Sequence, residues 1–481
     1  MSSSSFAGRI LVLGAGSVSQ CTVPLLINRI VSDPSQITIL DYVDNRNRFS
    51  DLITRGLKYE FGEVTKENLA DILSSYLTSG DLLLDLAWNI DANEIIGWCH
   101  DNNVLYLNTS VELWDPYEDA VKQTPQERTL YVRHMKLRDM VNGWDHKGAT
   151  AVVEHGANPG LVSHWVKQGL VDIANKAIAD GIATDEVSKA LDEEDYPALA
   201  EALTVKVIHI AERDTQVTTQ PKLPNEFVNT WSIAGFHEEG IAPAELGWGT
   251  HEKSLPRNAY THEAGPQNQI CIAQPGAMTW VRSWVPDYEI NGMVVRHGEA
   301  FTITDHLTTR NEDGTARYRP TVHYAYCPSD VAIASMRELN ARNWVLQDNL
   351  RIMNDEIIDG EDRLGVLLMG HPYKSWWTGS LLSIHDARRL APGQSATTLQ
   401  VAASILGAVA WMIQNPDKGV CVPDDLPWRE VLAVAGEFLG EQVSVPSDWT
   451  PVQNRTDVFE GWSAHAYDES DPWQFNNFLI S

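Results

Sequence analysis

Residues 10–19, Ile-Leu-Val-Leu-Gly-Ala-Gly-Ser-Val-Ser, are the stretch of this chain that decides its fold. The four apolar residues indicate a buried parallel strand, and the glycines predict a tight turn into a helix over residues 20–29. Gly14 lets the chain turn, and Gly16 lets backbone N–H groups approach a pyrophosphate at the helix N-terminus. Ser19 replaces the third glycine of the pattern, and it is small enough for helix and strand to pack closely. The residues predicted to hold a dinucleotide here are Gly14, Gly16, Ser17 and Val18.

A second predicted strand strengthens this interpretation. Residues 37–40, Ile-Thr-Ile-Leu, are followed by Asp41. Asp41 lies roughly 20–25 residues beyond the glycines, where a carboxylate accepts hydrogen bonds from the adenosine ribose. A carboxylate there would repel a 2′-phosphate, so the sequence favours NAD over NADP. Arg46 and Arg48 follow closely and leave that choice open. The alternative is a doubly wound domain that binds no dinucleotide.

The composition limits the function classes. At 481 residues the chain is long enough for two or three domains with sizeable cores. Its 65 acidic residues against 36 Lys and Arg give a net charge of −29, which disfavours a nucleic-acid partner. An acidic surface serves solubility, or it steers a cationic substrate. The 17 tryptophans are suited to binding ammonium groups, although most are expected in the core or at interfaces.

The cysteines and the N-terminus indicate the compartment. The five cysteines are far apart and no pair has metal-ligand spacing, so we expect reduced thiols and no metal site. Residues 1–5 lack the basic start and apolar run of a signal peptide. No window approaches the ~18 apolar residues of a membrane span. We therefore expect a cytoplasmic protein without a membrane segment.

Polar residues follow the predicted parallel strands of the N-terminal part. Asn89 comes after a strand at residues 81–87, and Thr109 and Glu112 come after a strand at residues 104–107. Ligands of open α/β sheets bind outside such strand ends. We expect Asn89 and Thr109 to contact the cofactor and Glu112 to lie at the same cleft. Asn89 has an equally simple alternative as a turn residue.

Asn158 precedes a predicted helix after the strand at residues 149–153. Asparagine is a good N-cap and Pro159 suits the first helical position, so Asn158 is either a helix cap or a site residue. An acidic surface segment follows at residues 179–202, and the chain then becomes rich in strands. The predicted strands are 204–210, 270–273, 279–285, 293–296, 299–304, 321–326, 365–370 and 376–384.

We predict an α/β protein with an N-terminal Rossmann domain and an α+β substrate-binding and dimerisation domain that contains a large mixed sheet. The Rossmann domain spans residues 1–155 and is completed by residues 390–425, where an apolar helix at 397–413 returns to it. The second domain spans residues 156–390. Residues 426–481 form a helix, at 427–439, and an irregular wrapping tail.

Several polar residues of the second domain lie in apolar surroundings, where burial is costly without a purpose. Glu212 ends a predicted strand, Trp231 lies in a short apolar run, and Glu239 follows it. His297 and Glu299 are two residues apart, so in an extended chain they face the same way. A glutamate beside a histidine raises its pKa and forms an acid/base pair. Each residue alone is more often structural, but the cluster favours a site.

The chain resembles the bacterial homospermidine synthases of the saccharopine-dehydrogenase-like superfamily. No G-x-S-x-G elbow, H-E-x-x-H or P-loop lysine competes with this assignment. The segments that carry the resemblance are 14–19, 108–112, 157–163, 211–216, 229–240, 244–252, 274–277, 318–324, 364–371 and 471–475.

The resemblance implies a homodimer that keeps NAD as a prosthetic group. Two putrescines, or putrescine and spermidine, are joined into sym-homospermidine with release of ammonia or diaminopropane. Ser19 departs from the family's pattern, and so does Gly298, where the family carries a larger residue. The resemblance implies that Trp231 would hold an ammonium or iminium carbon by its aromatic face and that Asn158 would orient the reacting amine. Glu112 would hold the distal ammonium or guard the entrance. The residues that would bind the diamine and move protons are Glu212, Glu239, His297 and Glu299.

Two other functions compete with this one. A saccharopine- or carboxynorspermidine-type NAD(P)-dependent dehydrogenase handles an amino acid and needs arginines for the substrate carboxylate, whereas the predicted site is rich in carboxylates. A non-catalytic NAD-binding protein would release no ammonia from putrescine.

Overall fold

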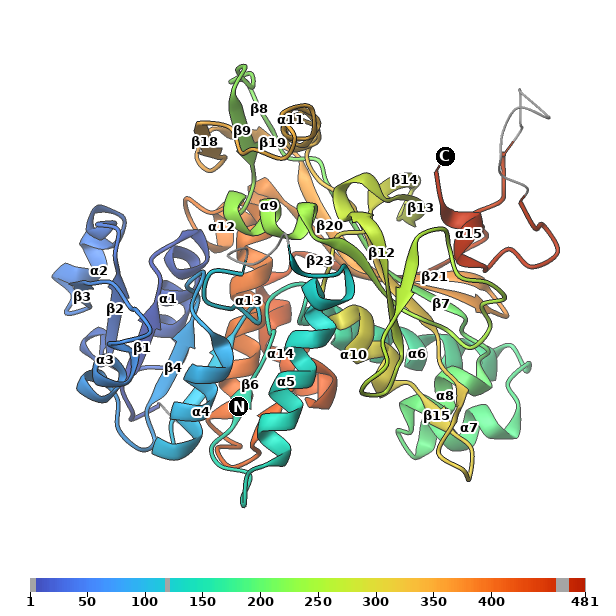
Figure 1. Ribbon diagram of the computed structural model, residues 1–481, viewed down its shortest axis with the longest axis horizontal. Helices are drawn as coiled ribbons and strands as arrows, with labels where there is room; N and C mark the ends of the chain where they lie inside the picture. The colour runs from blue at the N-terminus through green and yellow to red at the C-terminus, as the bar shows by residue number, and fades with distance from the viewer. Residues whose placement is uncertain (1–5, 117–121, 456–466, 481) are drawn as a thin grey trace.

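The glycine-rich stretch lies at the centre of a seven-stranded parallel sheet. The computed structural model describes residues 6–116, 122–455 and 467–480. The residues that argue against a signal peptide, 1–5, and part of the C-terminal tail lie outside these ranges. Figure 1 shows strands β1 to β4 of this sheet, in blue, beside a second and larger sheet. The first sheet has the order β22 (Val420–Cys421), β6 (Ala151–Val152), β5 (Leu105–Asn108), β4 (Leu82–Asp85), β1 (Ile10–Leu13), β2 (Ile37–Asp41) and β3 (Lys58–Phe61).

Helices cover both faces of this sheet, as the continuous apolar strands require. Ile10 and Val12 of β1 pack into one core, and Leu11 and Leu13 pack into another on the opposite face. The order of the strands reverses between β1 and β4, which is where ligands of such sheets bind. The first core includes residues of α1 (Ser17–Arg29) and α13 (Ala396–Met412), and the second includes residues of α3 (Leu69–Tyr76), α4 (Ala92–Asn102) and α5 (Leu130–Asn142).

The second sheet is ten-stranded and mixed. Its strand β7 pairs in parallel with β17 and antiparallel with β20. The predicted fold class is therefore confirmed. The main path of the sheet runs β11 (Ala259–Thr261), β12 (Gln269–Pro275), β10 (Pro243–Gly247), β17 (Thr321–Cys327), β7 (Val207–Asp214), β20 (Glu361–His371), β21 (Lys374–Ser383) and β23 (Glu441–Ser447), with β13 (Trp280–Val285) and β14 (Tyr288–Met293) joined to β17 through β14.

The remaining elements cover this sheet or extend from it. The helix α6 packs against β20 and β21, and Figure 1 shows α7 and α8 beyond it. The other helices are α2 (Ser50–Thr54), α6 (Leu161–Ala179), α7 (Asp185–Asp192), α8 (Tyr196–Ala202), α9 (Ile233–Ile241), α10 (Glu299–His306), α11 (Asp330–Ala341), α12 (Ile384–Leu390), α14 (Trp428–Ala435) and α15 (Phe475–Phe478). The short paired strands are β8 (Val217–Thr218) with β19 (Ile357–Asp359), β9 (Glu226–Asn229) with β18 (Asn349–Ile352), and β15 (Thr309–Arg310) with β16 (Ala316–Tyr318).

Four predictions about local structure are wrong. The strand predicted at residues 293–296 is absent beyond Met293, where β14 ends. Residues 299–304 form the first part of helix α10 instead of a strand, because packing against β10 and β17 outweighs the β-branched sequence there. Helix α6 begins at Leu161 with Gly160 as its N-cap, so Asn158 is no cap and Pro159 is not its first residue. The region after residue 439 is not wholly irregular, because β23 adds an edge strand to the large sheet.

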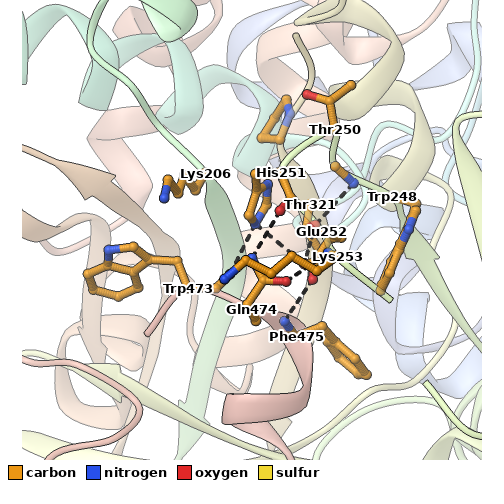
Figure 2. A network of polar contacts seen from close by, with 12 residues as sticks. Lys206, Trp248, Thr250, His251, Glu252, Lys253, Thr321, Trp473, Gln474 and Phe475 are labelled. Carbon is orange, nitrogen blue, oxygen red and sulfur yellow. Dashed lines mark hydrogen bonds and ion pairs between the residues drawn. The ribbon is translucent and has the colours of Figure 1, made fainter. Parts of the chain in front are cut away.

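The C-terminal tail is tied to a turn at residues 250–253, as Figure 2 shows. The Glu252 carboxylate accepts a hydrogen bond from Thr321 Oγ1 at 2.7 Å and another from the backbone N–H of Phe475 at 3.0 Å. His251 Nε2 lies 3.0 Å from the carbonyl oxygen of Trp473. These contacts hold α15 against the second sheet. Within the described ranges, no helix has the length and apolar character needed to cross a membrane.

Candidate active site

The glycine turn leaves open space at the N-terminus of α1. Gly14 has φ +90°, and a Cβ there would lie 2.7 Å from the carbonyl oxygen of Leu86, so only glycine fits. At Gly16, the N-cap, a Cβ would meet nothing within 4 Å. Ser19 is buried, and its hydroxyl donates to the Gly14 carbonyl oxygen at 2.6 Å. The turn therefore offers free N–H groups and room for a pyrophosphate, and the serine ties the helix to the turn.

Asp41 stands beside this turn at the end of β2. Its Oδ2 accepts from the backbone N–H of Ala15 at 2.5 Å and its Oδ1 from that of Val43 at 2.7 Å. Arg46 is engaged with Asp44, with 2.5 Å between Nη2 and Oδ2. The carboxylate thus has the position expected for a ribose contact, and the nearest arginine is bound to another acid. These residues fit NAD better than a 2′-phosphorylated dinucleotide.

A cavity of about 210 Å³ adjoins the carboxyl ends of β4, β5 and β6. The second sheet contributes β7 and β17 to its wall, and the N-terminal end of α13 closes another side. Both sheets therefore face the same cavity. Its lining includes Val18, Trp88, Thr109, Ser110, Glu112, Glu154, Asn158, Glu212, Trp231, Glu238, Glu239, Arg296, His297, Gly298, Tyr324, Thr397 and Thr398.

Asn158, Glu212 and Tyr324 form one hydrogen-bonded group in this wall. The Asn158 amide donates to Glu212 Oε2 at 2.8 Å and also to the Tyr324 hydroxyl. The Tyr324 hydroxyl donates to the same carboxylate oxygen. Burial raises the pKa of Glu212 to about 7, although the bonds from Tyr324 and Asn158 oppose this shift. A carboxyl that titrates near neutrality is suited to accept and return a proton.

Trp231 lies between β9 and α9, and a hydrogen bond fixes one edge of its indole ring. Its indole N–H donates to the Tyr326 hydroxyl at 2.8 Å, and its ring centroid is 5.7 Å from that of Phe236. Gly235 lies against the ring, because a Cβ there would be 3.0 Å from Trp231 Cζ3. The indole is therefore held in a defined orientation in the cavity wall, where it can meet a cation.

Glu238 and Glu239 are neighbours in α9 with opposite surroundings. Glu238 is bonded to Arg296 and to Arg133, the latter at 2.9 Å, and Trp88 Nε1 donates to it at 3.1 Å. Burial opposes ionisation of Glu238, but the two arginine charges outweigh it and lower the pKa to about 2. Glu239 Oε2 has no hydrogen-bond partner among the described residues, and burial raises the pKa of Glu239 well above its usual value. Glu238 is thus part of the framework, and Glu239 is available to a ligand.

His297 faces Glu239, with 3.6 Å between its Nε2 and Glu239 Oε1. Its ring meets the Tyr324 ring edge-on at a centroid distance of 4.5 Å. Burial lowers the pKa of His297 to about 4, so the predicted upward shift is wrong in sign. The imidazole is neutral at physiological pH and can accept a proton from a bound ammonium group.

Of the other predicted site residues, some line the cavity and some do not. Thr109 and Glu112 line the cavity. Burial raises the pKa of Glu112 to about 6, and Ser110 Oγ donates to it at 2.7 Å. Glu299 is buried at the start of α10 and is not among the residues that line the cavity. The extended chain that the prediction assumed for His297 and Glu299 is wrong, because residue 299 begins a helix. Asn89 has φ 67° and is bonded to Asp115, as a turn residue would be; its cofactor contact stays a prediction.

Sequence reasoning missed several residues of the site. Tyr324 donates a hydrogen bond to Glu212, as Asn158 does. Arg133 and Arg296 form ion pairs with Glu238. Glu154 lines the cavity, as Gly298 does. Glu154 had a detectable signal, because it directly follows a predicted parallel strand. Tyr324 and Arg133 had none, since their contacts cross 112 and 105 residues of sequence.

Family models and relatives cover almost the whole chain. The saccharopine dehydrogenase NADP binding domain matches residues 10–152, and the saccharopine dehydrogenase C-terminal domain matches residues 156–443. A homospermidine synthase of Blastochloris viridis is 40% identical over 482 residues, which cover 98% of this chain and 97% of the relative. The chain belongs to the homospermidine synthase family.

Other homospermidine synthases agree with this assignment. That of Mesorhizobium japonicum is 39% identical and covers 98% of this chain and 96% of the relative. The crystal structure of the Legionella pneumophila homospermidine synthase in complex with NAD is 37% identical, with a TM-score of 0.87 and coverage of 99% and 98%. Saccharopine dehydrogenase from Saccharomyces cerevisiae, with 10% identity, a TM-score of 0.51 and coverage of 91% and 100%, shares the fold alone.

Proposed function

We propose that this protein is an NAD-dependent homospermidine synthase that transfers an aminobutyl group. It joins two putrescines, or putrescine and spermidine, into sym-homospermidine and releases ammonia or diaminopropane. The observation that carries the proposal is the cavity in which Trp231 and a set of buried carboxylates meet beside the dinucleotide turn. An acidic cavity with an aromatic wall suits a diamine. The full-length similarity to homospermidine synthases supports the same conclusion.

The cofactor of this reaction is NAD. Gly14, Gly16, Ser17 and Val18 would hold its pyrophosphate, Asp41 its ribose, and Thr109 would reach it from the end of β5. When bound, NAD supplies the oxidation of the donor amine carbon and the later reduction of the new imine.

The residues of the cavity bind the diamine and move its protons. An ammonium group must lose a proton before its carbon can be oxidised, and Glu212, Glu239 and His297 are placed to accept it. Trp231 stabilises the cationic imine with its ring, and the Asn158 amide orients the reacting amine. Glu112 binds the distal ammonium group. Glu299 supports this set from the start of α10.

The protein acts as a homodimer in the cytoplasm. The resemblance to bacterial homospermidine synthases supports the dimer. The five cysteines, all free thiols and four of them buried, are consistent with a reducing compartment.

A saccharopine-type dehydrogenase is the second candidate, and the arginines of the cavity decide against it. Such an enzyme needs arginines free to bind a substrate carboxylate. Arg133 and Arg296 both form ion pairs with Glu238, so each guanidinium group is already engaged by a carboxylate. The cavity is therefore better suited to a cation than to an amino acid.

The test is incubation of the purified protein with putrescine and NAD, followed by mass detection of homospermidine and an ammonia assay. We expect both products in equal amounts with no net change in NADH. A dehydrogenase would instead change NAD(P)H stoichiometrically. Folded, NAD-loaded protein that forms neither product would overturn the proposal.

A further inference from the structure

A second cavity of about 340 Å³ lies behind the substrate cavity, between α5, α10 and the segment at residues 420–425. Its lining includes His134, Arg138, Asp305, His306 and Asp424. The Arg138 side chain is 37% exposed and forms an ion pair with Asp305 at 2.8 Å, so this cavity reaches the protein surface. The lining of this cavity thus includes histidines and carboxylates that can exchange protons with water, and none of its lining residues is among those that line the substrate cavity.

Glu154 and His134 connect the two cavities. Glu154 lines the substrate cavity and His134 lines the second one, and His134 Nε2 lies 2.8 Å from Glu154 Oε2. Both side chains are almost completely buried, at 2% and 1% exposure. The pair therefore forms a hydrogen-bonded bridge through the wall that separates the substrate cavity from the surface.

The surroundings hold this bridge in place. The backbone N–H of Glu154 donates to Asn108 Oδ1 at 2.7 Å, and the residue has φ 59°. A Cβ at Gly298 would lie 1.8 Å from Glu154 Oε2, so the carboxylate occupies space that only a glycine leaves. The ring of Phe301 packs edge-on against His134 at a centroid distance of 4.8 Å. Both side chains are thus fixed in the geometry that proton transfer needs.

We propose that Glu154 and His134 form a proton-exchange route between the substrate cavity and the second cavity. The proposal rests on the proposed function, in which each of two ammonium groups loses one proton before it reacts. Two protons return when the ammonia and the secondary amine of the product become charged, so the cycle has no net proton change. A closed cavity must store or exchange these protons while it holds its ligands.

Each transfer in the route balances. The Glu154 carboxylate accepts a proton from the cavity, the carboxyl group passes it to His134 Nε2, and the imidazolium releases a proton from its other nitrogen into the second cavity. The same steps in reverse return protons to the cavity. No electron transfer and no co-reactant besides water is involved.

The test uses the NAD-loaded His134→Ala variant with and without added imidazole. We expect kcat for homospermidine formation to fall about 100-fold, the lower end of what positioned acid–base groups contribute. Imidazole should restore most of it in a saturable manner, because it can enter the vacated position from the second cavity. Glu154→Gln keeps the shape and should lose kcat equally, without recovery in imidazole.

The matched control is His306→Ala, which enlarges the same cavity without breaking the bridge, and imidazole should leave its rate unchanged. A wild-type rate in His134→Ala would overturn the proton route. So would a loss of rate that imidazole and other small bases do not restore in a variant with normal NAD content and Tm. Neither result would contradict the proposed function. Wild-type protein that forms no homospermidine overturns the proposed function, and the route falls with it.

Discussion

Glu252 and Glu239 are two glutamates with opposite polar surroundings. Glu252, beside the C-terminal tail, accepts from Thr321 and from the backbone of Phe475, one donor for each oxygen (Figure 2). Glu239, in the cavity, has an oxygen with no partner among the residues that the structure describes. Burial raises the pKa of both, that of Glu252 to about 7. The raised pKa therefore does not distinguish a functional carboxylate from a structural one, whereas an unmet hydrogen bond in a cavity does.

The largest effect is expected for a substitution of Glu239, the glutamate in the cavity. Glu239→Gln keeps the size of the side chain but can neither accept nor donate the proton. We expect kcat for homospermidine formation to fall by about 100-fold or more, with NAD content and Tm unchanged. Steady-state kinetics and a thermal unfolding scan measure both. An unaltered kcat would place Glu239 with Glu252 as a structural group.

Trp231→Ala is expected to have the next largest effect. A desolvated cation–aromatic contact contributes about 2 kcal/mol, so turnover should fall roughly 30-fold while NAD stays bound. Trp231→Phe is the matched control, because it keeps an aromatic face and should retain part of the rate. Equal rates for the alanine and phenylalanine variants would show that the ring does not stabilise a cation.

Glu252→Gln tests whether Glu252 contributes to the stability of the fold and not to the reaction. An amide cannot accept from both Thr321 Oγ1 and the Phe475 N–H, so one buried donor loses its partner. We expect a loss of about 1–3 kcal/mol in the free energy of unfolding and less than a twofold change in kcat. Denaturant titration and the product assay measure the two quantities. A large loss of kcat in well-folded protein would mean that the tail turn takes part in the reaction.

The last test concerns the pH dependence of this stability. Burial raises the pKa of Glu252 from 4.5 to about 7, so the folded state retains a proton that the unfolded state releases. The stability that this proton linkage contributes is complete below pH 4.5 and is lost as the pH rises to about 7. The wild-type advantage over Glu252→Gln should therefore narrow between pH 4.5 and pH 7 in denaturant titrations. A constant or widening difference would contradict the assigned shift.

Local sequence signals predicted the dinucleotide turn and the polar residues at strand ends. Gly14 and Gly16 are recognisable because a turn over a phosphate site needs their conformations or their open space. Thr109 and Glu112 were predicted for the cavity because the carboxyl ends of parallel strands, and the residues just beyond them, lie along one edge of a sheet. These inferences need only neighbouring residues and the geometry of one sheet.

Helix α10 is a segment whose secondary structure could not be predicted from the local sequence. Residues 299–304 contain a β-branched run typical of a strand, but packing against β10 and β17 makes them helical. Glu299 is buried at the start of this helix and is not among the residues that line the cavity with His297. Burial also reverses the predicted pKa shift of His297, and burial is set by all the elements that pack around the imidazole.

The sequence by itself determined a dinucleotide-binding sheet, a second strand-rich region and a set of acids with a tryptophan, because hydrophobic period, turn chemistry and residue type are local properties. Only the tertiary structure decided which acids are satisfied and which are free. Glu238 and Glu239 are adjacent in α9, yet Arg133 and Arg296 neutralise the first alone. The structure alone also revealed the bridge from Glu154 to His134, because proximity between distant segments and loss of water arise only when the chain packs.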